Sequence, residues 1–166
     1  MKTRWMTAAI AATLMLSIVP AQAGDEGAWF DMANCSMCVN LTTEEGLLDH
    51  MTWENHIIAN GALSFTAVDE DYKDAYARMG KAMEAAGNKL MAGEQLPLCN
   101  FCQSYGALMM AGAKMEIVET AGGEIGLITS TDPAVVKKIH AHTQRTIDEF
   151  AKMFGGEEAG HEGHGH

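Results

Sequence analysis

The sequence is poor in basic residues, with only 11 lysine and arginine residues against 22 aspartate and glutamate residues. A surface this acidic repels nucleic acid and anionic lipid and attracts cations, so nucleic acid is not an expected partner. The sequence also has no Gly-rich phosphate loop, no nucleophile elbow and no His-Glu-x-x-His pattern. It therefore offers no positive argument for a hydrolase or a transferase, and a non-catalytic protein is favoured over an enzyme.

Long apolar runs are missing as well. The most apolar stretch, Ala8–Val19, follows a short basic start and is too short to span a bilayer. Pro20 ends it, and Ala21-Gln22-Ala23 is a cleavage site for a secretory signal peptide. We therefore expect residues 1–23 to be removed and the mature chain to be a soluble periplasmic or secreted protein without a membrane span. Without an adjacent arginine pair, the route is general secretion of an unfolded chain, so loading of a cofactor before export is not expected.

Cysteine is scarce, and its placement is the most informative feature of the chain. The only four cysteines form two Cys-x-x-Cys pairs, Cys35 with Cys38 and Cys99 with Cys102. A c-type haem is excluded because Val39 and Gln103, and not histidine, follow the pairs. A thioredoxin-like redox site would need a strand directly before the pair, and neither pair follows a predicted strand. The export route disfavours an iron–sulfur cluster.

Two interpretations of the four cysteines remain. In the first, four thiolates converge on one metal ion, and a soft site of four sulfurs suits Zn²⁺ or Cu(I). In the second, the cysteines form structural disulfides, for example Cys35–Cys99 and Cys38–Cys102, because exported cysteines are usually oxidised. Such long-loop crosslinks would each contribute roughly 4 kcal/mol of stability. The sequence indicates that the four cysteines belong together and leaves open what they hold.

Histidine and methionine offer further metal ligands. Residues 155–166 contain His161, His164 and His166 among glycines and glutamates. This segment has no large apolar residue that could pack against a core. We expect this tail to be disordered and to chelate divalent metal ions weakly. Met37, Met109 and Met110 lie near the cysteine pairs, and their thioethers could bind Cu(I), although methionine more often fills core gaps. Four further histidines, expected at the surface or its boundary, are His50, His56, His140 and His142.

The first cysteine pair opens a half of about residues 32–90. Thr42 and Glu45 have capping-box spacing and predict a short helix that ends near His50. Alternating residues from 53 to 68 around Asn60-Gly61 predict a β-hairpin. Apolar residues at helical spacing then predict a helix over about 71–90.

The second pair opens a half of about residues 97–154 in the same order. A helical segment is predicted over 105–113, and strands over 115–120 and 124–129 surround Gly122-Gly123. Pro133 suits the first turn of a helix that continues to about Phe154. Equivalent landmarks of the two halves are 62 to 64 residues apart, which indicates a duplication.

The fold prediction is therefore one α+β domain over residues 24–154. Two Cys-x-x-Cys–helix–β-hairpin–helix units would form a pseudo-twofold antiparallel sheet packed with helices, and the two-fold would bring both cysteine pairs together. The leading functional expectation is an exported, soluble metal-binding protein for copper or zinc. The alternatives are a disulfide-stabilised binding module for an organic ligand or protein partner, and a periplasmic thiol-disulfide oxidoreductase. A homodimer is also left open.

Overall fold

The computed structural model describes residues 27–154 of the 166-residue chain. The predicted signal peptide and the histidine tail lie outside these residues. The strands are β1 (Met51–Ile58), β2 (Gly61–Val68), β3 (Lys114–Thr120) and β4 (Gly123–Thr129). The α-helices are α1 (Lys73–Met91), α2 (Asn100–Met110) and α3 (Pro133–Phe154). Three short 3-10 helices are η1 (Cys38–Thr42), η2 (Leu47–His50) and η3 (Glu70–Tyr72).

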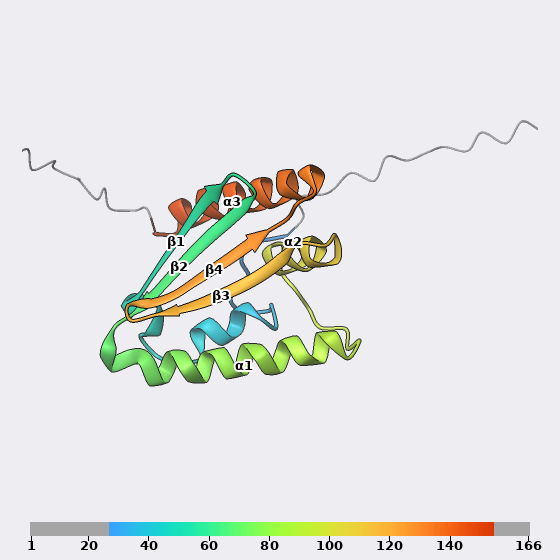
Figure 1. Cartoon of the computed structure of the whole chain (residues 1–166). Helices are drawn as coiled ribbons and strands as arrows, with labels where there is room; N and C mark the ends of the chain where they lie inside the picture. Colours follow the sequence, from blue (N-terminus) through green and yellow to red (C-terminus); the bar gives the residue numbers. More distant parts are fainter. Residues whose placement is uncertain (1–26, 155–166) are drawn as a thin grey trace, which may run out of the picture.

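The four strands form one antiparallel sheet in the order β1-β2-β4-β3 (Figure 1). The predicted α+β class, with a four-stranded antiparallel sheet and packed helices, is thus confirmed. A two-fold between β2 and β4 would produce this strand order, but the helices do not follow it. Helix α3 contacts β1 and β2, whereas α1 contacts mainly η1 and η3. The pseudo-twofold relation and the repeated units are not confirmed and stay predictions.

The predicted helix boundaries hold best where a side chain caps the helix. Helix α3 begins at Pro133 as expected, and the Asp132 carboxylate accepts a hydrogen bond from the Ala134 amide at 2.8 Å. The single helix predicted after Thr42 is wrong. The Thr42 hydroxyl instead donates to the Val39 carbonyl at the end of η1. Gly46, with a φ of 75°, separates η1 from η2.

Both hairpin turns lie one residue earlier than predicted. Ile58 pairs with Gly61, and Thr120 pairs with Gly123, so the turns are residues 59–60 and 121–122. The two glycines belong to strands, where a Cβ would overlap a neighbouring backbone: the Ile128 carbonyl oxygen at Gly61 and the Thr66 carbonyl oxygen at Gly123. They are therefore required for the close approach of β2 and β4.

Replacing either strand glycine is expected to destabilise the sheet. Gly61→Ala and Gly123→Ala should each lower the free energy of unfolding by about 2 kcal/mol, since the added methyl group must push a paired strand away. Urea unfolding of the purified protein measures this. The control is Gly80→Ala in α1, where no atom lies within 4 Å of the added Cβ. This control should stabilise the helix slightly, and an equal effect at all three positions would contradict the close-approach argument.

The two faces of the sheet have different surroundings. Alternate residues along a strand point to opposite faces, and the sheet residues that pack in the cores all share one face. We call it the closed face, and its core residues are Met51, Trp53, Ala62, Val68 and Ile128. Helix α3 lies behind this face in Figure 1 and contributes the buried Val135 and Ile139. The opposite face supplies no residue to the cores formed by residues 27–154.

Helix length and hydropathy bear on membrane insertion. No helix within residues 27–154 is both long enough and apolar enough to cross a membrane.

Candidate metal centre

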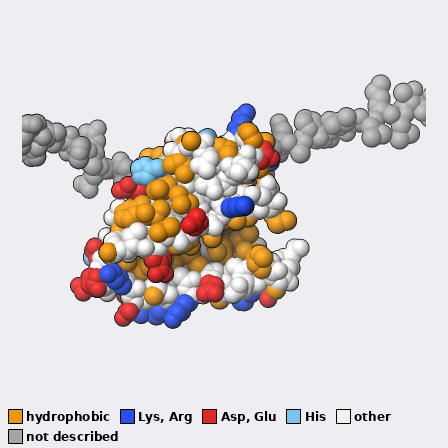
Figure 2. Space-filling view, viewed as in Figure 1, with side chains coloured by type: hydrophobic (Ala, Val, Ile, Leu, Met, Phe, Trp, Pro, Cys, Tyr) orange, Lys and Arg blue, Asp and Glu red, His pale blue; other side chains and the backbone are white. Residues whose placement is uncertain are grey.

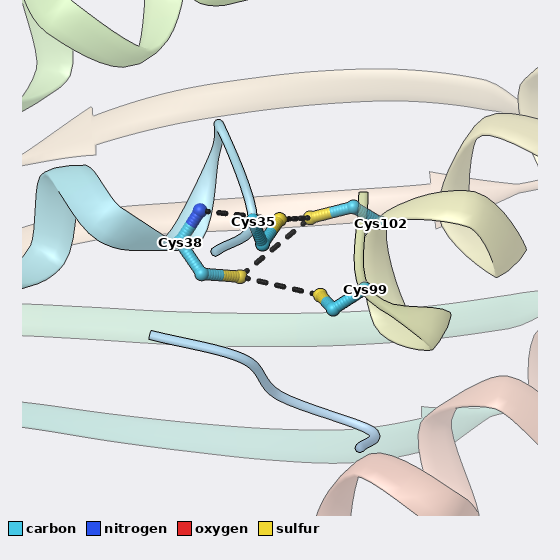
Figure 3. A group of neighbouring side chains, drawn as sticks. All are labelled: Cys35, Cys38, Cys99 and Cys102. Atoms are coloured by element: carbon cyan, nitrogen blue, oxygen red, sulfur yellow. Dashed lines mark hydrogen bonds between the residues drawn. The ribbon is translucent and has the colours of Figure 1, made fainter. Parts of the chain in front are cut away.

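The four cysteines converge on one point, as expected from their pairing in the sequence. The Sγ atoms of Cys38 and Cys99 lie 3.5 Å apart, those of Cys35 and Cys102 3.6 Å apart, and those of Cys38 and Cys102 3.7 Å apart. All four sulfurs lie within 4.8 Å of one another. Figure 3 shows them pointing inward, two from the N-terminal turn and two from the start of α2. All four cysteines are free in the structure.

The first pair lies in a tight turn that leads into η1. The Cys35 amide donates to the Asp31 carbonyl at 3.2 Å, and the Val39 amide donates to the Cys35 carbonyl at 3.0 Å. The Cys38 amide points at the Cys35 sulfur at 3.5 Å. This contact orients the Cys35 side chain within the turn.

The second pair occupies the first turn of α2. Cys99 is the N-cap residue, and Cys102 lies three residues into the helix. The Gln103 side chain fixes the entry to the helix by donating to the Leu98 carbonyl at 2.6 Å. The placement of this pair at a helix start was not predicted, because the helical pattern became visible only from residue 105.

Backbone hydrogen bonds join the two cysteine segments. The Ser36 amide donates to the Pro97 carbonyl at 2.9 Å, and the Phe101 amide donates to the Trp29 carbonyl at 2.9 Å. The Asn100 side chain also donates to the Gly27 carbonyl at 2.7 Å. The chain before Cys35 thus lies along the start of α2 and holds the two pairs together. Nothing in the sequence pattern of this leading segment indicated that role.

The thiols of the cluster perturb one another. A hydrogen bond from Cys102 lowers the pKa of Cys38 to about 6, although burial opposes the shift. The same hydrogen bond, followed by burial, raises the pKa of Cys102. Burial raises the pKa of Cys99. Without a cation, the cluster therefore favours the thiolate of Cys38 beside neutral Cys99 and Cys102, and a metal ion would have to displace the protons of those two thiols.

The arrangement has the dimensions of a four-thiolate metal site. Zinc–sulfur bonds of about 2.3 Å place the corners of a regular tetrahedron about 3.8 Å apart, close to the three measured separations of 3.5 to 3.7 Å. A disulfide would need sulfurs at about 2.05 Å. Cys35, Cys38 and Cys99 are only 1%, 2% and 7% exposed. Cys102 is half-buried. A metal ion held by all four sulfurs would have no coordination position left for a substrate, which is typical of a structural site.

The other predicted ligands divide into three groups. His161, His164 and His166 lie outside the described residues. Met37 packs against the cysteine cluster together with Met32, so it lies beside the site. Met109 instead packs in the core between α2 and α3, and Met110 is 90% exposed. Among the three methionines near the cysteine pairs in the sequence, only Met37 packs against the cluster.

One histidine contradicts the expectation that the folded histidines lie at the surface. His142 is 8% exposed, and its ring lies among those of Trp29 and Phe101 at centroid distances of 5.3 and 5.0 Å. Its Nδ1 atom is 2.9 Å from the Ser104 hydroxyl oxygen. Burial lowers the pKa of His142 to about 4. The sequence spacing on α3 did not reveal this, because the aromatic neighbours come from two distant segments.

Asp31 is a positioning residue that the sequence reasoning did not find. Its carboxylate accepts hydrogen bonds from the Asn34 amide at 2.8 Å, the Ala33 amide at 3.1 Å and the Asn34 side chain at 3.0 to 3.1 Å. The hydrogen bond from the Asn34 side chain is the main reason that the pKa of Asp31 is lowered. These contacts fix the turn immediately before Cys35.

Removing the Asp31 carboxylate is therefore expected to weaken metal binding without removing a ligand. Asp31→Ala should lower zinc affinity by roughly 10-fold, the usual effect of losing a group that orients a ligand. Competition with a chromophoric chelator measures the affinity. Asp49→Ala removes an equal charge from an exposed position in η2 and serves as the control. Equal affinities of the two variants would show that only charge matters.

Comparison with known proteins supplies no relative. No family model, no curated protein and no solved structure matches the chain.

Proposed function

We propose that this protein is an exported, non-catalytic metal-binding protein that holds one Zn²⁺ ion in the site formed by Cys35, Cys38, Cys99 and Cys102. The observation that carries the proposal is the spacing of the four sulfurs, all within 4.8 Å of one another. Two chain segments more than 60 residues apart supply the ligands in pairs. The bound ion would therefore also crosslink the N-terminal segment to α2.

Zinc is favoured over copper by the number and arrangement of the ligands. Four thiolates in a tetrahedron are typical of Zn²⁺, and the same soft ligands also bind Cu(I). Met37 beside the cluster adds a thioether that favours Cu(I), but four sulfurs already complete a tetrahedral shell. Cu(I) is therefore the alternative ion for the same site.

Metal content and a thiol count test the proposal together. The mature protein, purified without a chelator or an affinity tag, should contain about one zinc ion per chain by elemental mass spectrometry. After denaturation with a chelator, it should show four reactive thiols. One copper ion with four thiols would retain the site and change its ion. No metal and no free thiols would overturn the proposal in favour of structural disulfides.

Export and metal capture by the tail are part of the same proposal. The signal-peptide pattern of residues 1–23 supports secretion, and the intact mass of the exported protein should correspond to a chain that begins at Gly24. The histidines of the tail would bind divalent ions weakly. An exported protein that retains Met1 would contradict the processing step.

Deleting the tail separates capture from folding. A chain ending at Phe154 should keep its thermal midpoint, because residues 155–166 contain no large apolar side chain to bury. The shortened chain should bind Ni²⁺ and Cu²⁺ less tightly than the full-length chain at pH 7.5. The difference in affinity between the two chains should vanish below about pH 6, where imidazole is protonated. Titration calorimetry measures both chains. Equal binding would show that the tail has no role in capture.

A pocket supports a second candidate function, a binding module for an apolar ligand. It has a volume of about 410 Å³ and an apolar lining. The lining residues are Met32, Leu41, Leu48, Met51, Trp53, Phe150 and Ala151. Met32 also packs against the cysteine cluster, so the pocket and the cluster share a wall. Tryptophan fluorescence on titration with a fatty acid tests this candidate, because Trp53 lines the pocket; an unchanged signal counts against it.

A further inference from the structure

One face of the sheet is apolar and has no partner among residues 27–154. We call it the open face. Its central residues on β2 and β4 are Leu63, Phe65, Ala67, Ile125 and Leu127. None of them belongs to a core that the described residues form. Figure 2 shows hydrophobic side chains gathered over the strands on this side, and Figure 1 shows α3 on the far side.

The edges of the open face carry polar, ionisable side chains in a regular arrangement. Strand pairing places four residues side by side in one row across the sheet. The row begins at the imidazole of His56 on β1, passes Leu63 and Leu127, and ends at the carboxylate of Glu116 on β3. The next row runs from Glu54 through two apolar residues to Val118. The His56 ring is held at its edge by a contact of 3.1 Å with Glu54.

The residues that directly flank the described domain carry no large apolar side chain that could cover this face. Residues 24–26 are Gly-Asp-Glu, and residues 155–166 contain only glycine, glutamate, histidine and one alanine. Large apolar side chains are needed to bury an apolar sheet face. Residues 24–26 and 155–166 therefore cannot supply the covering surface.

We propose that a second copy of this chain covers the open face, with the two sheets packed face to face about a two-fold axis parallel to the strands. Such an axis places β1 of one copy over β3 of the other. It brings His56 opposite Glu116 of the second copy at both ends of the row, while Leu63, Phe65 and Leu127 meet in the middle. The single-chain surface therefore places an imidazole opposite a carboxylate and apolar residues opposite apolar residues, as a self-complementary two-fold interface requires. This proposal does not depend on the metal.

The area of the open face sets the expected affinity of the dimer. Four strands about 4.8 Å apart and about 24 Å long present a face of roughly 450 Å². Stable interfaces bury about 800 Å² per partner. We therefore expect a reversible dimer that forms at micromolar or higher protein concentration.

Two neighbouring residues of β3 provide a matched test. Val118 lies on the open face and Ile117 on the closed face, and their side chains are 41% and 56% exposed. In sedimentation velocity of the mature protein over a concentration series, Val118→Asp should weaken dimerisation at least 10-fold and Ile117→Asp should leave it unchanged. Circular dichroism and zinc content check that both variants fold. Equal weakening by both variants would indicate pairing through the β3 edge and would overturn the proposal.

The row that runs from His56 to Glu116 gives a second test, and this test leaves the apolar residues in place. His56→Glu should weaken the dimer at least 10-fold, because it places two carboxylates opposite each other, and adding Glu116→Lys should restore association. A wild-type protein that stays monomeric to several hundred micromolar would overturn the proposal. A double variant no stronger than His56→Glu alone would overturn the proposed orientation.

Discussion

If the four cysteines hold zinc as proposed, removing the metal with a chelator is expected to lower the thermal midpoint of the protein by at least about 15 °C. The ion would join the segment around Cys35 to the start of α2, in addition to the hydrogen bonds that the two segments share. A structural zinc ion contributes about 10 kcal/mol or more of binding free energy to a folded site. Losing about 5 kcal/mol of this stabilisation already corresponds to a shift of roughly 15 °C for a domain of this size. Scanning calorimetry with and without a chelator measures the shift.

A ligand substitution provides the matched control for chelation. Cys38→Ser should lower zinc affinity at least 100-fold and bring the midpoint close to that of the metal-free protein, because the serine hydroxyl is a poor zinc ligand. Ser36→Ala, in the same turn, should change neither quantity. A midpoint that resists chelators but falls on reduction would instead identify structural disulfides, which contribute stability through crosslinking.

Acidification is expected to destabilise the protein through His142, by up to about 3 kcal/mol. Its pKa is lowered to about 4 by burial, whereas an unfolded histidine titrates near 6.5. Protonation therefore favours the unfolded chain. The stabilising contribution of neutral His142 is fully present above about pH 6.5, falls as the pH drops through that value, and is lost near pH 4. Urea unfolding between pH 7.5 and pH 4 measures the slope.

The His142→Phe variant isolates this effect from the protonation of the cysteines. Phenylalanine keeps an aromatic ring beside Trp29 and Phe101 but has no titratable group. Thiolate protonation and metal loss affect both proteins, so the difference between their unfolding free energies reports the histidine alone. That difference should shift in favour of the variant by about 3 kcal/mol from pH 7.5 to pH 4. Parallel curves would show that His142 is accessible to solvent in the folded state.

Several features could be predicted from the sequence because they depend on local chemistry or on the small number of cysteines in the chain. The strands, α3 and the α+β class follow from alternation, helical spacing and the Asp132-Pro133 start. The association of the four cysteines followed from their being the only cysteines, arranged in matched pairs. The identity of the ion stayed open, because the same four residue types suit zinc, Cu(I) or disulfides.

Only the tertiary structure decided how these parts are combined. The alternating apolar residues Leu63 and Phe65 predicted a strand, but alternation does not tell which face a helix will cover. Here α3 packs against the other face at β1, β2 and β4, and the apolar row lies outside the cores. In the same way, Asp31 and Trp29 have no pattern of their own and acquire their roles only by lying against the start of α2. Local sequence specifies which elements form and which residues can bind a metal, whereas long-range packing brings the sulfurs within bonding reach of one ion and selects the buried surfaces.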